Sequence, residues 1–144
     1  MNTPTPPHPT RQTALPTPSS LRAAAQMAAR QGEPLVVLVS LHGCVFCDVV
    51  RNHYLGPMHQ RGECVAVQVD MHDRQHTLQT IDGHTSNPHA QVQAWGARVA
   101  PTVLFLNEKG AELAERLEGM GIADFYGVYL QDRLDSARAR VRAS

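Results

Sequence analysis

The sequence predicts an α/β domain with a four-stranded mixed sheet, in which two parallel strands are followed by an antiparallel hairpin and helices flank the sheet. Residues 35–41 form a run that is apolar except for Ser40 and rich in valine, which is typical of a strand buried on both faces of a sheet. Strand-like and helix-like segments then alternate, and this order favours parallel pairing of the first two strands. Later, a tight turn at residues 107–110 separates two strand-like segments and predicts the hairpin.

Length and charge limit the kind of protein this can be. The chain has 144 residues, enough for one domain with a real core. Thirteen basic residues balance thirteen acidic ones, so the chain lacks the long-range field that a nucleic-acid or membrane-surface binder normally carries. No apolar stretch is long enough to cross a membrane. We therefore expect a monomer that binds no nucleic acid and does not insert into a membrane.

The amino terminus differs in composition from the rest of the chain. Residues 1–19 are rich in proline and threonine and show no apolar periodicity, which predicts a disordered leader ahead of a domain over residues 20–144. The leader lacks the apolar central segment of a signal peptide. Two locations stay open: the cytoplasm, or the periplasm if an export signal was removed or was missed ahead of Met1.

The first half of the domain alternates helix and strand. Ser19 or Ser20 can cap a helix over residues 21–31, after which the buried strand begins. Apolar residues at helical spacing predict a second helix over 44–59, which the Gly56-Pro57 pair should break or kink late. Alternating valines over 65–69 predict the second strand.

The second half begins with a polar stretch. Residues 71–87 are weakly patterned and can hold a small hairpin around Asp82-Gly83. Asn87 and Pro88 read as the cap and first residue of a short helix, and residues 102–106 as the third strand. Alternation over 112–117 predicts an edge strand.

A long last helix follows Gly119, and its apolar spacing predicts which side chains face the core. The expected inner stripe consists of Ile122, Phe125, Tyr126, Tyr129, Leu134, Ala137 and Val141.

The chemistry of the chain centres on a Cys-x-x-Cys pair, Cys44 and Cys47, at the junction of the first strand and the second helix. The first turn of a helix has free amide hydrogens and the positive end of the dipole, which stabilise a thiolate at Cys44. Cys47 lies one turn further on the same side and can attack a mixed disulfide formed on Cys44. The pattern indicates that Cys44 is the attacking thiol and Cys47 the resolving one.

The cysteines also allow other interpretations. The pair could be half of a zinc site, or a metal-binding or metal-delivery module with nearby His42, but a structural site usually needs a second Cys pair or a paired His motif, and neither is present. The third cysteine, Cys64, sits in a strand-like run and is expected to be a small buried apolar residue.

A proline at the start of the third strand is the second notable feature. Pro101 occupies a position where a strand tolerates proline for structural reasons alone. Alternatively, a cis Ala100-Pro101 bond facing the thiols would leave the backbone groups of Ala100 free to pair with an extended substrate.

Together these segments resemble the thioredoxin-like thiol–disulfide oxidoreductases. The resemblance covers about residues 32–141 and rests on the Cys-x-x-Cys after an apolar strand, the stretch 99–106 with its proline, the turn at 107–110, and Gly119. Residues 81–83 followed by a short helix resemble the single-domain bacterial branch of that family. The resemblance implies a thioredoxin-like fold, a catalytic Cys pair, a cis Pro101 that contacts substrate with Ala100, and Gly119 on the same surface.

The chain also departs from the thioredoxin pattern. Gly43 stands where thioredoxins carry tryptophan, and Val45-Phe46 replaces the Gly-Pro between the cysteines. The strand over 35–41 lacks the carboxylate that assists proton transfer at the resolving thiol. His42 is the candidate proton relay in its place, because imidazole accepts protons near neutral pH. The notable alternative, which the sequence favours, is that His42 is a plain turn residue.

We therefore expect an enzyme that exchanges thiols and disulfides with protein partners. No basic residue lies between the cysteines, which predicts a moderately reducing couple and hence a reductant. No cofactor is expected beyond the redox-active Cys44–Cys47 disulfide, and turnover requires an upstream electron donor.

Overall fold

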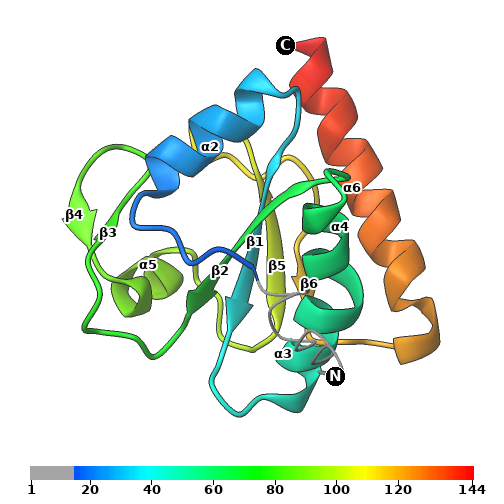
Figure 1. The fold of residues 1–144 in the computed structure, drawn as a ribbon, viewed down its shortest axis with the longest axis horizontal. Coiled ribbons are helices and arrows are strands. Elements are labelled where there is room, and N and C mark those ends of the chain that lie inside the picture. The colour runs from blue at the N-terminus through cyan, green and yellow to red at the C-terminus, as the bar shows by residue number, and fades with distance from the viewer. Residues whose placement is uncertain (1–14) are drawn as a thin grey trace, which may run out of the picture.

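The computed structural model describes residues 15–144 (Figure 1), and most of the predicted leader lies outside this range. The elements, with the labels of Figure 1, are α2 (Leu21–Arg30), β1 (Leu35–Ser40), α3 (Val45–Val49), the π-helical η1 (Val50–Leu55), α4 (Gly56–Gln60), β2 (Val65–Asp70), β3 (Leu78–Gln79), β4 (Thr85–Ser86), α5 (Pro88–Ala94), β5 (Thr102–Leu106), β6 (Leu117–Glu118), the 3-10 turn η2 (Ala123–Phe125) and α6 (Tyr126–Ala143).

The main sheet has the predicted mixed topology. Its strand order is β2-β1-β5-β6, with β1 parallel to β2 and antiparallel to β5, and with β5 antiparallel to β6. β1 is central, so Leu35 pairs with Val65 on one side and with Leu106 on the other. A second sheet of β3 and β4 forms the small hairpin expected around Asp82-Gly83.

Side chains of β1 alternate between two cores, one on each face of the sheet. Val36 and Leu38 join the core under α4 and α6, whereas Val37 and Val39 join the core under α2 and α5. Figure 1 shows these helices on opposite sides of the sheet. All six residues of β1 are buried, which explains why its first five are apolar without alternation.

The domain begins earlier than the sequence suggested. Leu15 is buried in the core, and its carbonyl accepts a hydrogen bond from the Gln68 side chain. The carbonyl of Pro16 accepts the backbone N–H of Gln68, and that of Ser19 accepts the N–H of Gln79. The boundary predicted at residue 19 is therefore wrong for residues 15–19, because the carbonyls of Pro16 and Ser19 satisfy backbone donors on the outer edges of β2 and β3.

The helix after β1 continues through the Gly56-Pro57 pair. The N–H of Gly56 bonds to the carbonyl of Arg51, five residues earlier, so the turns before the proline are π-helical. Proline removes a donor and crowds the preceding turn of an α-helix, and a π segment is a common way for a helix to accommodate such a disruption. The predicted break thus takes the form of wider turns over Val50–Leu55.

The predicted edge strand over 112–117 is largely wrong. Glu112 makes a single bridge to Leu106, and regular pairing returns only at Leu117. Between them, Arg116 forms an ion pair with Glu112 and donates to the carbonyl of Trp95, so side-chain contacts hold this segment away from the ladder.

The inner stripe predicted for the last helix is also partly wrong. The buried side chains of α6 are Tyr126, Leu130, Leu134 and Ala137. Ile122, Phe125 and Tyr129, which were expected inside, are exposed. The reason is that the α-helix starts only at Tyr126, after a 3-10 turn, so helical spacing cannot be counted from Ile122.

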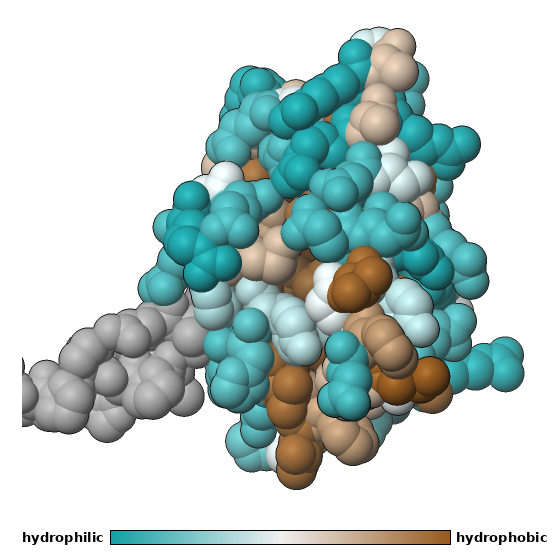
Figure 2. All heavy atoms as spheres, turned by 90° about the vertical axis from the view of Figure 1, so that its right-hand side faces the viewer, coloured by the Kyte–Doolittle hydropathy of each residue, from teal (hydrophilic) through white to brown (hydrophobic). Residues whose placement is uncertain are grey.

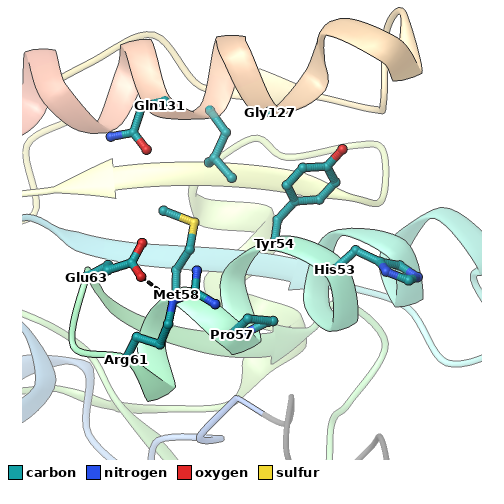
Figure 3. A pocket seen from close by; sticks show the side chains of 9 residues that line it. His53, Tyr54, Pro57, Met58, Arg61, Glu63, Gly127 and Gln131 are labelled. Carbon is teal, nitrogen blue, oxygen red and sulfur yellow. Dashed lines mark hydrogen bonds and ion pairs between the residues drawn. The ribbon is translucent and has the colours of Figure 1, made fainter.

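α6 approaches the helix of η1 and α4 closely. A Cβ on Gly127 would lie 3.2 Å from the ring of Tyr54, so the absence of a side chain lets the two helices meet there. Figure 3 shows Tyr54 and Met58 pointing from this helix toward α6, at a hollow of about 230 Å³. No cysteine lines this hollow. Among residues 15–144, no helix is long and apolar enough to span a membrane.

Candidate active site

The two thiols lie where β1 gives way to α3. The N–H of Cys44 bonds to the carbonyl of Leu41 at 3.1 Å, and Gly43 adopts the left-handed backbone (φ 80°) that this turn requires. Cys44 is the N-cap of α3, and its sulfur accepts the backbone N–H of Cys47 at 3.2 Å. A free backbone N–H at a helix N-terminus stabilises an anion, and here this N–H donates to the sulfur of Cys44.

The two cysteines differ in access to solvent. Both are free thiols; Cys44 is partly exposed, whereas Cys47 is fully buried. Burial, together with a hydrogen bond to Cys44, raises the pKa of the Cys47 thiol well above its usual range, while a backbone hydrogen bond at Leu41 and the charge of Arg51 act in the opposite direction. Cys47 is therefore protonated at neutral pH until something favours its anion.

The loop before β5 faces the exposed thiol. The Ala100–Pro101 peptide bond is cis, and the carbonyl oxygen of Ala100 lies 3.7 Å from the sulfur of Cys44. The N–H of Gly119 donates to the carbonyl of Pro101 at 2.7 Å, so the segment after β6 joins the same surface. The structure thus brings together Cys44, Cys47, Ala100, Pro101 and Gly119, which the sequence motifs had grouped.

An apolar surface surrounds this arrangement. With the exception of Met27, the large hydrophobic side chains that are exposed in the described part of the chain come from three segments. They are Val45, Phe46, Val99, Ile122, Phe125, Val128 and Tyr129, which we call the apolar rim. In Figure 2, apolar side chains gather in the lower half of the face shown, at the end of the molecule where Figure 1 places α3 and the start of α6.

A polar cavity lies beside the same turn. Its volume is about 380 Å³, and it is bordered by the turn at residues 41–43, the helix after it and the end of β2. Arg51 lines it, donates to the Gln68 side chain at 3.2 Å and forms an ion pair with Asp48. His42 is exposed at the border of this cavity.

Within residues 15–144, no group of three His, Cys, Asp or Glu side chains is placed so that it could hold a metal ion. Cys64 lies apart in the core, as predicted, and burial raises its pKa to about 12. Sequence reasoning missed Arg51 and Tyr126, both of which interact electrostatically with Cys47. Arg51 could have been found, because it follows Cys47 by one helical turn; Tyr126 depends on tertiary packing.

The central strand of the sheet ends at a dithiol, and the loop before β5, with Ala100 and Pro101, lies opposite it. We call residues 99–101 the proline loop. This arrangement is that of the thioredoxin-fold class of proteins. The model of the thioredoxin-like domain matches residues 21–127 of this chain. The chain therefore belongs to the thioredoxin-like domain family, whose members include thiol–disulfide oxidoreductases.

Solved structures share this fold at low identity. Thioredoxin O2 from Arabidopsis thaliana, in its oxidised state, is 13% identical with a TM-score of 0.55, over 85% of this chain and 96% of that one. A thioredoxin-fold protein from Helicobacter pylori is 11% identical with a TM-score of 0.55, over 93% and 94%. A putative disulphide-isomerase from Bacteroides thetaiotaomicron is 17% identical with a TM-score of 0.54, over 82% and 93%. A search of the curated proteins finds no match.

Proposed function

We propose that this protein is a thiol–disulfide oxidoreductase that reduces disulfides in protein partners through Cys44 and Cys47. The observation that carries the proposal is the asymmetry of the pair. Cys44 is partly exposed and accepts an N–H at the start of α3, whereas Cys47 is buried one turn behind it. A nucleophile needs access to a partner, and a resolving thiol needs access only to its neighbour.

The first step is attack on the partner. The Cys44 thiolate forms a bond to one sulfur of the partner disulfide, the partner's S–S bond breaks, and the second partner sulfur leaves with the electron pair and takes a proton from solvent. The result is a mixed disulfide between Cys44 and the partner.

The second step releases the partner. Cys47 loses its proton to solvent and attacks the sulfur of Cys44, the mixed disulfide breaks, and the remaining partner sulfur leaves as a thiolate. Two electrons have then passed from the dithiol to the partner, and a Cys44–Cys47 disulfide remains. An external dithiol donor must reduce this disulfide for another turnover.

The proline loop and the apolar rim support a protein as the partner. Ala100 presents a backbone carbonyl next to the Cys44 sulfur, where an extended partner segment could pair with it. Pro101 and Gly119 would shape the same surface. Exposed apolar side chains such as Phe46 and Val99 flank it and would be removed from water when a polypeptide docks.

The two residues between the cysteines support the reducing direction. The residues between the cysteines are Val45 and Phe46, so no cation there stabilises the reduced form as a thiolate. We expect a reduction potential nearer to the roughly −270 mV of thioredoxins than to the roughly −120 mV of strong oxidants.

The test uses the full chain and a protein disulfide as substrate. Wild type with dithiothreitol should accelerate reduction of the substrate, and Cys44→Ser should abolish the acceleration. Cys47→Ser keeps the nucleophile Cys44 and should accumulate a mixed disulfide with the partner. This species should appear as a band on non-reducing gels and should be lost when the sample is treated with reductant. A Cys47→Ser protein that traps no partner, with wild type inactive, would contradict the proposal.

A further inference from the structure

The resolving step poses a charge problem at Cys47. Its side chain is fully buried, and it must become an anion in order to attack. The strand behind it supplies hydrocarbon, since β1 over Leu35–Val39 carries no ionisable side chain. Something else must favour the anion, or the step would be slow at neutral pH.

Three titratable groups of the described chain interact with Cys47. Cys44 hydrogen-bonds to it and favours the protonated form. Tyr126, from α6, is buried, carries no charge at neutral pH and has no hydrogen-bond partner for its hydroxyl within residues 15–144. Arg51 is the one cation of the three, and its charge favours the thiolate.

Arg51 is held in place from two directions. It follows Cys47 by four residues and so returns to the same side of the helix, and its side chain is only 21% exposed. Its guanidinium is paired with Asp48 and donates to Gln68 of β2 at 3.2 Å. A guanidinium that is already held by two contacts loses less conformational entropy when it stabilises a nearby thiolate than a free surface lysine would.

We propose that Arg51 is a positioning residue for the resolving thiol: its guanidinium, anchored by Gln68 and Asp48 at the wall of the polar cavity, stabilises the Cys47 thiolate during release of the partner. The inference rests on the proposed function, because it assigns a role within the second step. In that step Cys47 gives its proton to water, bonds to the Cys44 sulfur, and expels the partner thiolate. Arg51 changes no bonds.

Other charged groups around the guanidinium reduce its effect without cancelling it. Asp48 is its direct partner but is 54% exposed and screened by water. Asp70, Asp73, His42 and His76 border the same cavity, where Asp73 is engaged with His76. Because Cys47 is fully buried and Arg51 is only 21% exposed, the charge of Arg51 is less screened at the thiol than that of the more exposed Asp48.

The experiment separates the two steps with an aromatic disulfide, 5,5′-dithiobis(2-nitrobenzoate), mixed rapidly with the reduced full-length protein. Attack by Cys44 releases the first coloured thiolate, and attack by Cys47 on the mixed disulfide releases the second. Cys47→Ser should show the first phase only, which assigns the phases.

Arg51→Met should slow the second phase roughly three- to tenfold at pH 7 and leave the first phase unchanged. The midpoint of the second phase's pH profile should move to higher pH. Arg51→Lys, which keeps the charge, should restore most of the rate. Arg138→Met is the matched control: Arg138 is also 21% exposed and ion-paired, with Glu33 in place of Asp48. It should lower the melting temperature without slowing the second phase.

Equal slowing by Arg51→Met and Arg51→Lys, slowing of both phases together, or an unchanged second phase would each overturn the role of Arg51. Failure of the proposed function looks different: wild type would then complete both phases with the reagent yet reduce no protein disulfide.

Discussion

The three cysteines differ in burial. Cys44, at the cap of α3, is partly exposed; Cys47, one turn later, is fully buried; and Cys64 is enclosed in the core. These differences support the separate roles that we propose for the three cysteines, because the fold controls which form of each sulfur is stable and what can touch it.

Cys64 provides a residue-scale prediction on pH. Burial raises its pKa from 9.0 to about 12, so the folded state holds this proton after the unfolded chain has lost it. The stabilising contribution is therefore complete below pH 9 and is lost as the pH rises toward 12. Between these values, the free energy of unfolding of the reduced protein should fall more steeply for wild type than for Cys64→Val, by up to about 1.4 kcal/mol per pH unit.

Urea denaturation in reductant at successive pH values measures this difference directly. Cys47 and all other titrating groups remain in both proteins, so they cancel in the comparison. Parallel pH dependences for the two proteins would show that the Cys64 thiol ionises as easily in the fold as in the unfolded chain.

At the scale of elements, the sequence predicts a helix or strand correctly where a single hydrophobic periodicity runs through the segment without interruption. β1, β2 and β5 occupy the ranges expected within a residue, because their apolar or alternating runs are bounded by turns. The cap at Ser20 and the Asn87-Pro88 start of α5 also match, because capping depends on neighbouring residues alone.

Patterns failed where tertiary contacts decide. The segment at 113–116 alternates like a strand, yet the bonds of Arg116 to Glu112 and Trp95 hold it off the sheet. Residues 15–19 look like disordered chain, yet their carbonyls serve the donors of Gln68 and Gln79. Neither the contacts of Arg116 with Trp95 nor the hydrogen bonds of residues 15–19 can be recognised from sequence, because the fold brings these distant residues together.

The register of α6 gives a prediction at this scale. Leu130 is fully buried between the helices and the sheet, although the sequence-based stripe omitted it, whereas Phe125 is 51% exposed although the stripe included it. Leu130→Ala should cost about 2–5 kcal/mol of unfolding free energy, because it leaves a cavity in the core. Phe125→Ala should cost less than about 1 kcal/mol.

Chemical denaturation of the two variants measures both values. If Phe125→Ala proves the more destabilising of the two, the register described for α6 is incorrect. Near-equal losses would likewise contradict it.

At the scale of the whole molecule, three distant parts of the chain build one surface. The turn after β1 supplies Cys44, the loop before β5 supplies Ala100, and the segment after β6 supplies Gly119. The Cys pair and the proline could be found from sequence because their spacing is distinctive. The apolar rim could not, because Phe125 and Tyr129 have the spacing of core residues and only their positions in the fold show that they face solvent.

The rim leads to a prediction about substrate size. A protein partner covers a wide surface around the thiols, whereas a small aromatic disulfide touches only the immediate neighbours of Cys44. Phe125→Ser and Tyr129→Ser remove exposed apolar area from η2 and α6 and leave both cysteines and residues 99–101 unchanged in sequence. Each should raise KM for a protein disulfide by roughly three- to tenfold, since the apolar area that each change removes from the docked surface is worth about 1 kcal/mol.

Two controls accompany this measurement. The rate with 5,5′-dithiobis(2-nitrobenzoate) should stay the same, and Met27→Ser, which removes an exposed apolar side chain of α2 outside the rim, should affect neither substrate. An equal decrease in rate with both substrates would mean that these side chains support the thiols themselves; unchanged rates with both would mean that partners dock without reaching α6.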